Sequence, residues 1–435
     1  MKKNITKNTS IFINGGKKVC GQVKIGGDKI SAVHLLFALL ISNEKTEIRN
    51  MSFCGDVINI IDWIKKDNIA EVKMASDSIT ISPNNTNFSL TSISKSRASI
   101  CLVTAVALKF GSVKINYDIG GCCFTDRSIN RHLDLIKAFG ISVSIEGDKL
   151  VAVKKRIIHK IKFDCSTEFG PSVGVTEHAL IASMVFNGEV ILTNVALEPV
   201  SKVLINFLQK STNRKVELTG RVIKINAVKE IEYCRSIIIL PFDTTVALTY
   251  ISMAIATGGS VYLNGVNNLI SSIDELLRKM NVQYSSGKDG LNVCVKNIIH
   301  PGIIECAPWP GIPSDVGPII LAGLCGYEGI TVLTDRVYNK RSTHVEGLNK
   351  MGFCLSTNGQ SITVKGQNPN NDIVVANAID IRAGAALAIG ALSRNSKTII
   401  TDAYQIFRGY QNFIDDLYNL GVDIAIGGKQ WENQE

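Results

Sequence analysis

The stretch CLVTAVALKFGSVKIN, residues 101–116, decides the fold, because it joins an apolar helix to a short alternating strand. Its first ten residues place apolar side chains on nearly every side of a helix, which predicts a helix that is buried all round. Apolar and polar residues then alternate from Val113 to Asn116, which predicts a strand with one buried face and one wet face. Gly111 separates the two elements, as glycine commonly does where a helix ends.

The same pattern recurs along the chain at nearly constant spacing. By subtraction, its six copies end 66 to 78 residues apart, at Asn50, Asn116, Asn194, Asn264, Asp335 and Asp402. In most copies an amphipathic helix and further short strands follow, so that each unit is roughly βαβαββ. Spacing this regular argues against a chance succession of helices and strands. We therefore predict an α/β (α+β) fold of two domains with three repeats each, in which buried helices lie inside the sheets.

Composition excludes several classes of protein. With 45% hydrophobic and 20% charged residues in 435, the chain is neither disordered nor collagen-like. Eleven scattered cysteines form no CxxC pair, so no zinc or redox motif is indicated, and free thiols favour a reducing cytoplasm. No apolar segment of a signal peptide follows the basic start, and the uncharged stretch 244–273 is interrupted by Gly and Asn. We expect a cytoplasmic protein with no membrane span.

The formal charge of +9 is dispersed along the chain. The densest basic cluster, residues 154–162, has no interleaved aromatic residues, whereas nucleic-acid readers concentrate Lys and Arg on one face. Nucleic acid is therefore not the expected partner. Small anionic ligands are a better use of these cations.

Two candidate anion-binding positions stand where buried helices begin. Lys29 follows the turn Gly26-Gly27-Asp28, and a glycine-rich turn that leads into a helix N-terminus is suited to binding anions. The alternative is ordinary turn chemistry. Arg97 lies among serines that are typical of helix N-caps, at the positive end of the second buried helix. Its alternative is a solvated arginine in a first turn.

A third candidate is the loop from Gly120 to Arg127. Two glycines allow unusual backbone angles before Cys122 and Cys123, and Arg127 would lower the pKa of a nearby thiol. Adjacent cysteines in extended chain point to opposite sides, so at most one would be reactive. The alternative is a small buried cysteine, which is the common fate of a free thiol.

A fourth candidate is the stiff loop from Ala307 to Asp315. It contains three prolines and ends in a carboxylate before the fifth buried helix, as a rigidly held general base requires. An equally good interpretation is that Asp315 only caps that helix. Two further segments, 380–384 and 407–410, carry Asp380, Arg382 and Arg408 near the sixth buried helix.

Together these motifs resemble the enolpyruvyl transferase family, over about residues 11–427. Within the family the resemblance is greater to the branch that acts on UDP-N-acetylglucosamine than to the shikimate branch, which lacks the cysteine matched by Cys122. The segments that carry the resemblance follow one another in the family's order: Lys29, Arg97, Gly120 to Arg127, Ser172-Val173-Gly174, Ile312 to Asp315, Lys340 to His344, Asp380 to Ala383 and Phe407 to Gln411.

The resemblance implies an inside-out α/β barrel of two domains joined by a double crossing. Residues 29–240 would form the first domain, and residues 1–28 with 241–435 the second. The active site would lie between the domains, which would close on their ligands. No cofactor and no metal is implied, and the substrates would be small molecules.

The resemblance also implies the reaction, which transfers the enolpyruvyl group of phosphoenolpyruvate to a hydroxyl of UDP-N-acetylglucosamine and releases phosphate. Cys122, Asp315, Lys29, Arg408 and Asp380 would be catalytic. Lys29, Arg127, Arg341, Arg382 and Arg408 would bind phosphoenolpyruvate. Arg97, Arg127, Ser172, Val173, Gly174 and Asp315 would bind the acceptor. Cys122 would protonate the methylene carbon, and Asp315 would take the proton of the acceptor hydroxyl.

Some residues depart from the family pattern. Ile30 replaces an asparagine that binds the acceptor, Val200 replaces a glutamate, and the segments 128–131 and 241–245 are altered. Two alternatives therefore stay open. One is the same chemistry on another nucleotide or sugar of a specialised pathway, which would be the partner in place of UDP-N-acetylglucosamine. The other is a non-catalytic paralogue that binds a ligand, although such a protein has no need to keep both the acid and the base.

Overall fold

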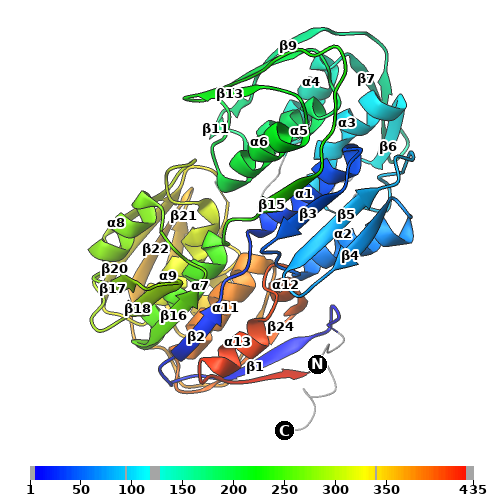
Figure 1. Cartoon of the computed structure of the whole chain (residues 1–435). Helices are drawn as coiled ribbons and strands as arrows, with labels where there is room; N and C mark the ends of the chain where they lie inside the picture. Colours follow the sequence, from blue (N-terminus) through cyan, green and yellow to red (C-terminus); the bar gives the residue numbers. More distant parts are fainter. Residues whose placement is uncertain (1–4, 94–95, 118–127, 339, 428–435) are drawn as a thin grey trace. The chain divides into compact units, whose positions relative to one another are not determined.

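The computed structural model describes residues 5–93, 96–117, 128–338 and 340–427. Its internal contacts divide the chain into two compact units (Figure 1). Of the residues described, those from Gly27 to Pro241 form one unit, here called the contiguous unit. The chain up to Gly26 and from Phe242 onward forms the other, here called the split unit.

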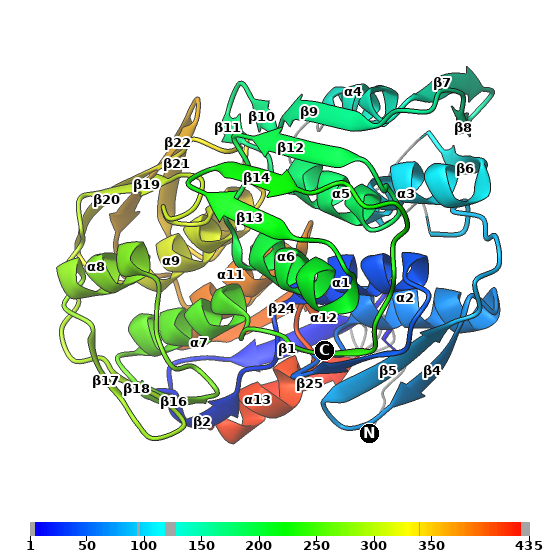
Figure 2. The ribbon, with the colours of Figure 1, turned by 45° about the horizontal axis from the view of Figure 1, so that its top comes forward.

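Three buried helices contact one another at the centre of the contiguous unit: α1 (Lys29–Ile41), α3 (Ile100–Phe110) and α5 (Val173–Ser183). Nearly all of their residues are buried, because apolar side chains occupy every side of each helix. In Figure 2 the sheets of this unit lie around these helices. The stretch quoted at the outset forms α3 and the strand after it, as predicted.

The described part of this unit contains three larger sheets and one short ribbon. Their strand orders are β15 (Ser236–Ile239), β3 (Thr46–Arg49), β5 (Ser78–Pro83) and β4 (Ala70–Met74); β13 (Val216–Thr219), β14 (Val222–Ile225), β12 (Glu189–Thr193) and β9 (Lys160–Asp164); β6 (Ser112–Asn116), β8 (Lys149–Lys154) and β7 (Ile141–Glu146); and β10 (Ser166–Thr167) with β11 (Gly170–Pro171). The remaining helices are α2 (Gly55–Lys66), α4 (Asn130–Ala138), α6 (Pro199–Ser211) and the 3-10 turn η1 (Arg97–Ser99).

The split unit is also built around three buried helices that contact one another: α7 (Thr244–Thr257), α9 (Gly317–Leu324) and α11 (Ile381–Leu392). Its sheets have the orders β23 (Val374–Asn377), β24 (Lys397–Thr401), β1 (Ser10–Asn14) and β25 (Asp423–Gly427); β17 (Gln283–Ser286), β18 (Gly290–Cys294), β16 (Ser260–Asn264) and β2 (Cys20–Lys24); and β19 (Ile303–Cys306), β20 (Gly329–Asp335), β22 (Ser361–Gly366) and β21 (Cys354–Asn358). Short helices complete it: η2 (Ser314–Val316), α8 (Ser271–Lys279), α10 (Val345–Lys350), α12 (Tyr404–Phe407) and α13 (Phe413–Asn419).

The strands bury one face, as their alternating sequences predict. In β6, Val113 and Ile115 are buried while Ser112 and Lys114 are exposed. Several of these strands are followed directly by Asn or Asp, because the chain turns there with a left-handed backbone. Asn50, Asn194 and Asp402 have φ angles of 58°, 50° and 50°, a conformation that Asn and Asp tolerate better than most residues.

Within the described ranges, the chain passes from one unit to the other at residues 26–27 and at residues 241–242. The amide of Asp28 donates to the carbonyl of Pro241 within the contiguous unit, and that of Asp243 donates to Gly26 within the split unit. Gly27 has no room for a side chain, because a Cβ would lie 1.9 Å from the carbonyl oxygen of Asn50. Among the described residues, no helix has both the length and the apolar character needed to cross a membrane.

Candidate active site

The carboxylate of Asp315 in the split unit is paired with two arginines. It lies in η2, after the proline-rich loop and before α9. Oδ1 is 2.6 Å from Nη2 of Arg341, and Oδ2 accepts a 2.9 Å hydrogen bond from Nε of Arg382. Both arginine side chains are 6% exposed, whereas that of Asp315 is 36% exposed. The helix-cap interpretation is wrong, because no side-chain capping bond is found at the start of η2 or α9.

The two guanidinium groups determine the protonation state of Asp315. Burial by itself would raise the pKa of this carboxyl, but Arg341 and Arg382 outweigh burial and hold the pKa well below its ordinary value. Asp315 is therefore ionised at neutral pH. The arrangement is a carboxylate with an accessible edge that faces two buried, fixed positive charges.

Hydrogen bonds hold Arg341 in place from the side of β20. Its Nη1 donates to Oγ of Ser314 at 2.8 Å, and that hydroxyl donates to Oδ2 of Asp335. The other oxygen of Asp335 accepts from the backbone amides of Val337 and Tyr338. Because Nη1 and Nη2 of Arg341 are both paired, with Ser314 and with Asp315, the guanidinium is held in one orientation.

Arg382 is held by Tyr410 and by its own helix. Its Nη1 donates to the hydroxyl of Tyr410 at 3.1 Å, and its guanidinium carbon lies 5.7 Å from the centre of that ring. Thr249 donates its hydroxyl proton to Thr245, so Tyr410 in turn donates to Thr249 at 2.7 Å. The hydroxyl of the buried Tyr410 therefore connects Arg382 to α7 through its two hydrogen bonds.

Asp380 caps the helix that carries Arg382. Its Oδ1 accepts from the backbone amides of Arg382 and Ala383, both at 2.9 Å, and its Oδ2 accepts from the hydroxyl of Thr343 at 2.6 Å. The geometry gives Asp380 a structural task, because it satisfies two amides that the first turn of α11 leaves unpaired. Arg408 follows α12, donates to Oε1 of Gln405 at 2.8 Å, and stands two residues before Tyr410.

In the contiguous unit, Lys29 is the first residue of α1 and is buried. Asp28 caps this helix by accepting from the amide of Ser31 at 2.7 Å. The ammonium of Lys29 lies 3.1 Å from Oδ2 of Asp56 at the start of α2. A single cation thus stands beside the positive end of a buried helix, as the glycine-rich turn suggested.

Four of the predicted acceptor-binding residues, Arg97, Ser172, Val173 and Gly174, lie at the starts of α3 and α5. Arg97 lies in η1, directly before α3, and its Nη2 lies 3.4 Å from the carbonyl oxygen of Ser128. Ser172 caps α5 by accepting from the amide of Val175 at 3.3 Å, and Val173 and Gly174 form the first turn. The serine predicted to cap α3 is present as Ser99, but its hydroxyl makes no capping bond.

Cys122 and Arg127 lie outside the described residues. Among the described site residues, the structure brings together Asp315, Arg341 and Arg382. It places Asp380 at the start of the helix that carries Arg382. It places Lys29 at the start of α1, Arg97 before α3, and Ser172, Val173 and Gly174 at the start of α5. Sequence reasoning missed four residues that hold these side chains: Asp56, Ser314, Asp335 and Tyr410. Tyr410 and Ser314 lie inside motifs that were singled out, which was the available signal.

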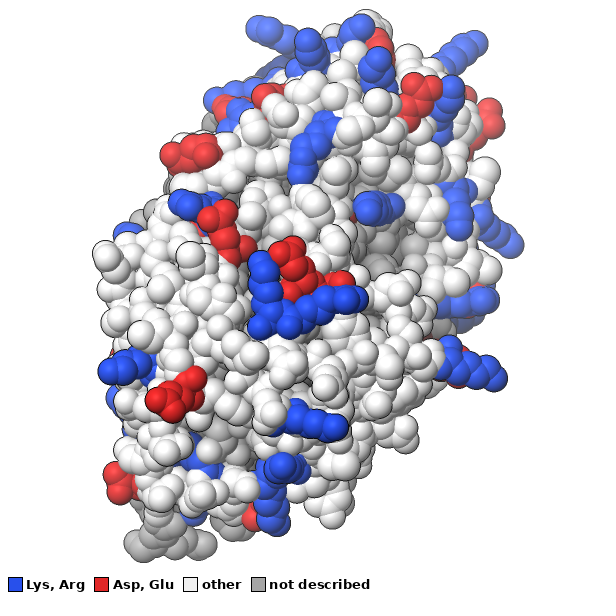
Figure 3. Space-filling model, turned by 90° about the vertical axis from the view of Figure 1, so that its left-hand side faces the viewer, with Lys and Arg blue, Asp and Glu red and all other residues white. Residues whose placement is uncertain are grey.

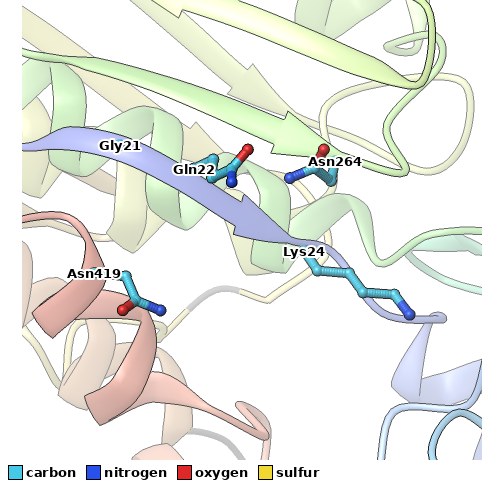
Figure 4. Close-up of a pocket in the computed structure, with 5 residues that line it drawn as sticks. All are labelled: Gly21, Gln22, Lys24, Asn264 and Asn419. Atoms are coloured by element: carbon cyan, nitrogen blue, oxygen red, sulfur yellow. The ribbon is translucent and has the colours of Figure 1, made fainter.

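A surface hollow of about 520 Å³ lies elsewhere in the split unit (Figure 4). It is lined by Gly21, Gln22, Lys24, Asn264 and Asn419, none of which is a predicted site residue. Gln22 and Asn264 point toward each other from β2 and β16. Among the described residues, no cluster of His, Cys, Asp and Glu side chains has three members placed to hold a metal ion.

Figure 3 shows one face of the molecule, on which Lys and Arg side chains are spread out and interspersed with Asp and Glu. No single basic patch gathers on this face. The distribution agrees with the dispersed charge of the sequence, and differs from the concentrated basic surface of nucleic-acid readers.

Comparison with known proteins identifies the class of this protein. The model of the family EPSP synthase (3-phosphoshikimate 1-carboxyvinyltransferase) matches residues 13–417. The chain belongs to this family, whose members and named relatives are enolpyruvyl (carboxyvinyl) transferases. The family predicted from the motifs is confirmed.

The similar curated proteins include two from clostridia. UDP-N-acetylglucosamine 1-carboxyvinyltransferase 2 of Clostridium tetani is 30% identical over 95% of this chain and 99% of its own. UDP-N-acetylglucosamine 1-carboxyvinyltransferase 1 of Clostridium acetobutylicum is 31% identical over 95% of this chain and 98% of its own.

Solved structures show the same mixed α/β fold. The enolpyruvyl transferase NikO of Streptomyces tendae aligns with a TM-score of 0.86 over 97% of this chain and 99% of its own, at 18% identity. The EPSP synthase of Acinetobacter baumannii aligns with a TM-score of 0.71 over 96% of this chain and 100% of its own, at 16% identity.

Proposed function

We propose that this protein transfers the enolpyruvyl group of phosphoenolpyruvate to a hydroxyl of UDP-N-acetylglucosamine and releases phosphate. Family membership and relatives of this name at 30–31% identity support the proposal. The observation that carries it is the pairing of Asp315 with Arg341 and Arg382. One base and two fixed cations are what a reaction between a hydroxyl and a dianionic phosphoenolpyruvate requires.

The proposed reaction proceeds by addition and elimination. The acceptor oxygen bonds to the central carbon of phosphoenolpyruvate while Asp315 takes the hydroxyl proton and Cys122 gives a proton to the methylene carbon. The thiolate of Cys122 then takes back a proton from that carbon, the carbon–oxygen bond to phosphate breaks as the double bond is restored, and the proton held by Asp315 leaves with the phosphate. One enolpyruvyl ether and one phosphate form from each pair of substrates. Cys122 is also suited to form a covalent adduct with the enolpyruvyl carbon.

In this proposal, Lys29, Arg127, Arg341, Arg382 and Arg408 bind the phosphate and carboxylate of phosphoenolpyruvate. Asp315 is a weak base while both guanidinium charges act on it. We expect phosphoenolpyruvate to take up part of that charge, which would raise the pKa of Asp315 and make it a better base. Asp380 would serve the reaction by fixing the helix turn of Arg382, and not by touching the substrate.

In the contiguous unit, Arg97, Ser172, Val173 and Gly174 are proposed to bind the acceptor, together with Arg127 and Asp315. Arg97, Ser172, Val173 and Gly174 lie at the starts of α3 and α5, and a helix start offers amides to an anion such as a diphosphate. We further propose that the two units are inside-out α/β barrels, each of three βαβαββ repeats, with the domain boundaries given above. A cytoplasmic location follows from the substrates.

A second candidate function is the same chemistry on another nucleotide or sugar. Ile30, which stands where the family has an acceptor-binding asparagine, is 37% exposed at the start of α1. Arg131, in the altered segment 128–131, donates to the carbonyl oxygen of Ser166 at 3.1 Å and also to that of Asp164. The guanidinium of Arg131 is therefore already hydrogen-bonded to backbone carbonyl oxygens. Both features favour an acceptor that differs from that of the relatives.

The test measures phosphate release from phosphoenolpyruvate with UDP-N-acetylglucosamine, and determines the intact mass of substrate and protein in the same sample. Phosphate together with a mass-confirmed enolpyruvyl ether supports the first proposal. A phosphoenolpyruvate-derived adduct on the protein that is absent in Cys122→Ser, without any ether, supports the second. With neither product nor adduct, the enzymatic proposal fails and the non-catalytic paralogue gains weight.

A further inference from the structure

The core of the contiguous unit contains a cluster of polar side chains among its apolar helices. The residues are all at most 7% exposed: His34 on α1, Cys101 and Thr104 on α3, His132 on α4, and Glu177 and His178 on α5. Buried groups of this kind are rare without hydrogen-bond partners. The proposed reaction assigns no role to any of them.

At the centre of the cluster, His34 and Glu177 form a buried ion pair. Nε2 of His34 lies 2.7 Å from Oε2 of Glu177, and its Nδ1 lies 2.9 Å from the carbonyl oxygen of Ile30. A carbonyl oxygen only accepts hydrogen bonds, so Nδ1 carries a proton. Burial alone would lower the pKa of His34, but the carboxylate of Glu177 raises it well above its ordinary value. His34 is therefore an imidazolium ion.

This cluster connects the first turns of three helices. His34 bonds to the carbonyl of Ile30 in the first turn of α1. The thiol of Cys101 on α3 donates to the carbonyl of Gly174 in the first turn of α5, at 3.5 Å. Glu177 lies three residues after Gly174 on the same helix. The ion pair thus links α1 to α5 directly beneath the residues proposed to bind the acceptor.

Stability alone does not explain the pair. Replacing a buried ion pair by apolar residues of similar size is often neutral or stabilising, and most of the buried residues of α1 and α5 are apolar. Moreover, Oε1 of Glu177 is buried and has no hydrogen-bond partner among the described residues. A cysteine protease-like triad is excluded, because Cys101 is 1% exposed and burial raises the pKa of its thiol.

We propose that His34 and Glu177 are positioning residues that set the affinity and selectivity for the acceptor, because they fix the first turns of α1 and α5 relative to each other. This inference rests on the proposed function, in which Val173 and Gly174 in the first turn of α5 bind the acceptor and Ile30 in the first turn of α1 stands where the family has an acceptor-binding residue. Neither side chain touches the substrate. The effect of the pair is local, because His34 contacts the carbonyl of Ile30 and Glu177 lies on the helix that carries Gly174.

The test uses the full chain with His34→Leu and Glu177→Leu combined, so that no buried charge is left unpaired. The control is Leu180→Ala, which creates a cavity on α5 without altering a polar group. We expect the double variant to fold and its KM for the acceptor to rise about tenfold or more, with KM for phosphoenolpyruvate and kcat changed by no more than about threefold. The single variant Glu177→Gln keeps the shape of the side chain and an accepting oxygen beside His34. Its KM for the acceptor should therefore rise less than that of the double variant.

Amide hydrogen exchange of the unliganded proteins supplies a readout that does not depend on the identity of the acceptor. Faster exchange in the double variant at the starts of α1 and α5, with the rest of the unit and Leu180→Ala unchanged there, supports the inference. If the wild type is active and the double variant has an unchanged KM for the acceptor, the inference is overturned while the proposed function stands. If the wild type makes no product with UDP-N-acetylglucosamine, the proposal of that acceptor fails. The inference about His34 and Glu177 is then tested by amide hydrogen exchange alone. Unchanged exchange at both helix starts would then overturn the inference.

Discussion

Arg382 donates from Nε to Oδ2 of Asp315 at 2.9 Å, across 67 residues of sequence. The start of α11 is thereby tied to the start of α9 through one charged hydrogen bond. Arg341 contacts the other carboxylate oxygen at 2.6 Å, so both oxygens of the proposed base are occupied. The charges of Asp315, Arg341 and Arg382 are therefore coupled. Replacing any one of these residues changes the electrostatic environment of the other two.

Asp315→Asn is expected to lower kcat by about 10²- to 10⁴-fold, the usual contribution of a general base. The amide keeps the shape of the side chain but cannot take a proton from the acceptor. The measurement is the initial rate of phosphate release at saturating substrates. Thermal unfolding of the same variant serves as the control for folding. A loss below about fivefold in a folded variant would show that another group removes the proton.

The pH dependence of the rate should reveal the change in Asp315 that phosphoenolpyruvate causes. In the free protein the pKa of Asp315 is held well below its ordinary value, so the carboxylate stays ionised down to about pH 4 and adds no acid limb to kcat/KM. Its contribution to stability is present above the unfolded-state pKa of about 3.9 and is lost only at lower pH. We expect kcat to show an acid limb at higher pH than kcat/KM. Coincident limbs would contradict charge uptake by the substrate.

Arg382→Lys is expected to lower kcat/KM for phosphoenolpyruvate by about 10- to 100-fold, although the charge is kept. A lysine cannot contact Asp315 and Tyr410 together, because its single ammonium lacks the fork of the guanidinium. The matched variant Tyr410→Phe removes the hydroxyl, and with it the hydrogen bonds to Arg382 and Thr249, but leaves the contact of Arg382 with Asp315, so it should cost less than about tenfold. Steady-state kinetics compares the two. Equal losses would mean that the hydroxyl of Tyr410, and not the bond to Asp315, is what matters.

Asp56→Asn tests whether the neighbour of Lys29 tunes its charge for phosphoenolpyruvate. With Asp56 ionised, the ammonium of Lys29 is partly neutralised at 3.1 Å. We expect Lys29→Gln to abolish most activity, whereas Asp56→Asn should change KM for phosphoenolpyruvate by less than about tenfold, since it leaves the cation in place. Isothermal titration with phosphoenolpyruvate provides the comparison. The assignment of Lys29 is wrong if its Gln variant binds phosphoenolpyruvate as the wild type does.

Much of this structure could be predicted from local sequence. The apolar run and alternating strand of residues 101–116 specify α3 and β6, because burial periodicity is a property of neighbouring residues. The caps of α1 and α5 at Asp28 and Ser172 follow from the same local chemistry. Lys29 could be singled out from this local chemistry, whereas Gly174 was predicted only from the family resemblance.

The pairings within the site could not be predicted, because they join residues far apart in sequence. Nothing local distinguishes Asp315 as a partner of Arg341 and Arg382 from Asp315 as a helix cap, and the structure excludes the cap. His34 and Glu177 stand in apolar helices 143 residues apart by subtraction of their numbers, so each alone is an isolated polar residue. Only packing of α1 on α5 makes them a pair.

Asp416 provides a test of stability that is independent of catalysis. Its carboxylate on α13 accepts a 2.6 Å hydrogen bond from the hydroxyl of Tyr250 on α7, and burial raises its pKa to about 6. The folded protein thus binds this proton more tightly than the unfolded chain, whose aspartate pKa is about 3.9. The stability gained from the proton is full below about pH 4 and is lost as pH rises through about 6.

Asp416→Asn is therefore expected to stabilise the protein at pH 8 by about 1–2 kcal/mol, a value reduced for partial solvent screening. The amide oxygen can still accept from Tyr250, so little should change at pH 4. Denaturant unfolding of the variant and the wild type at both pH values makes the comparison. Tyr250→Phe is the control, because it removes the donor but leaves the buried carboxyl, and so should retain the pH dependence. A variant that is less stable than the wild type at pH 8 would show that ionised Asp416 contributes favourably, which would contradict the raised pKa.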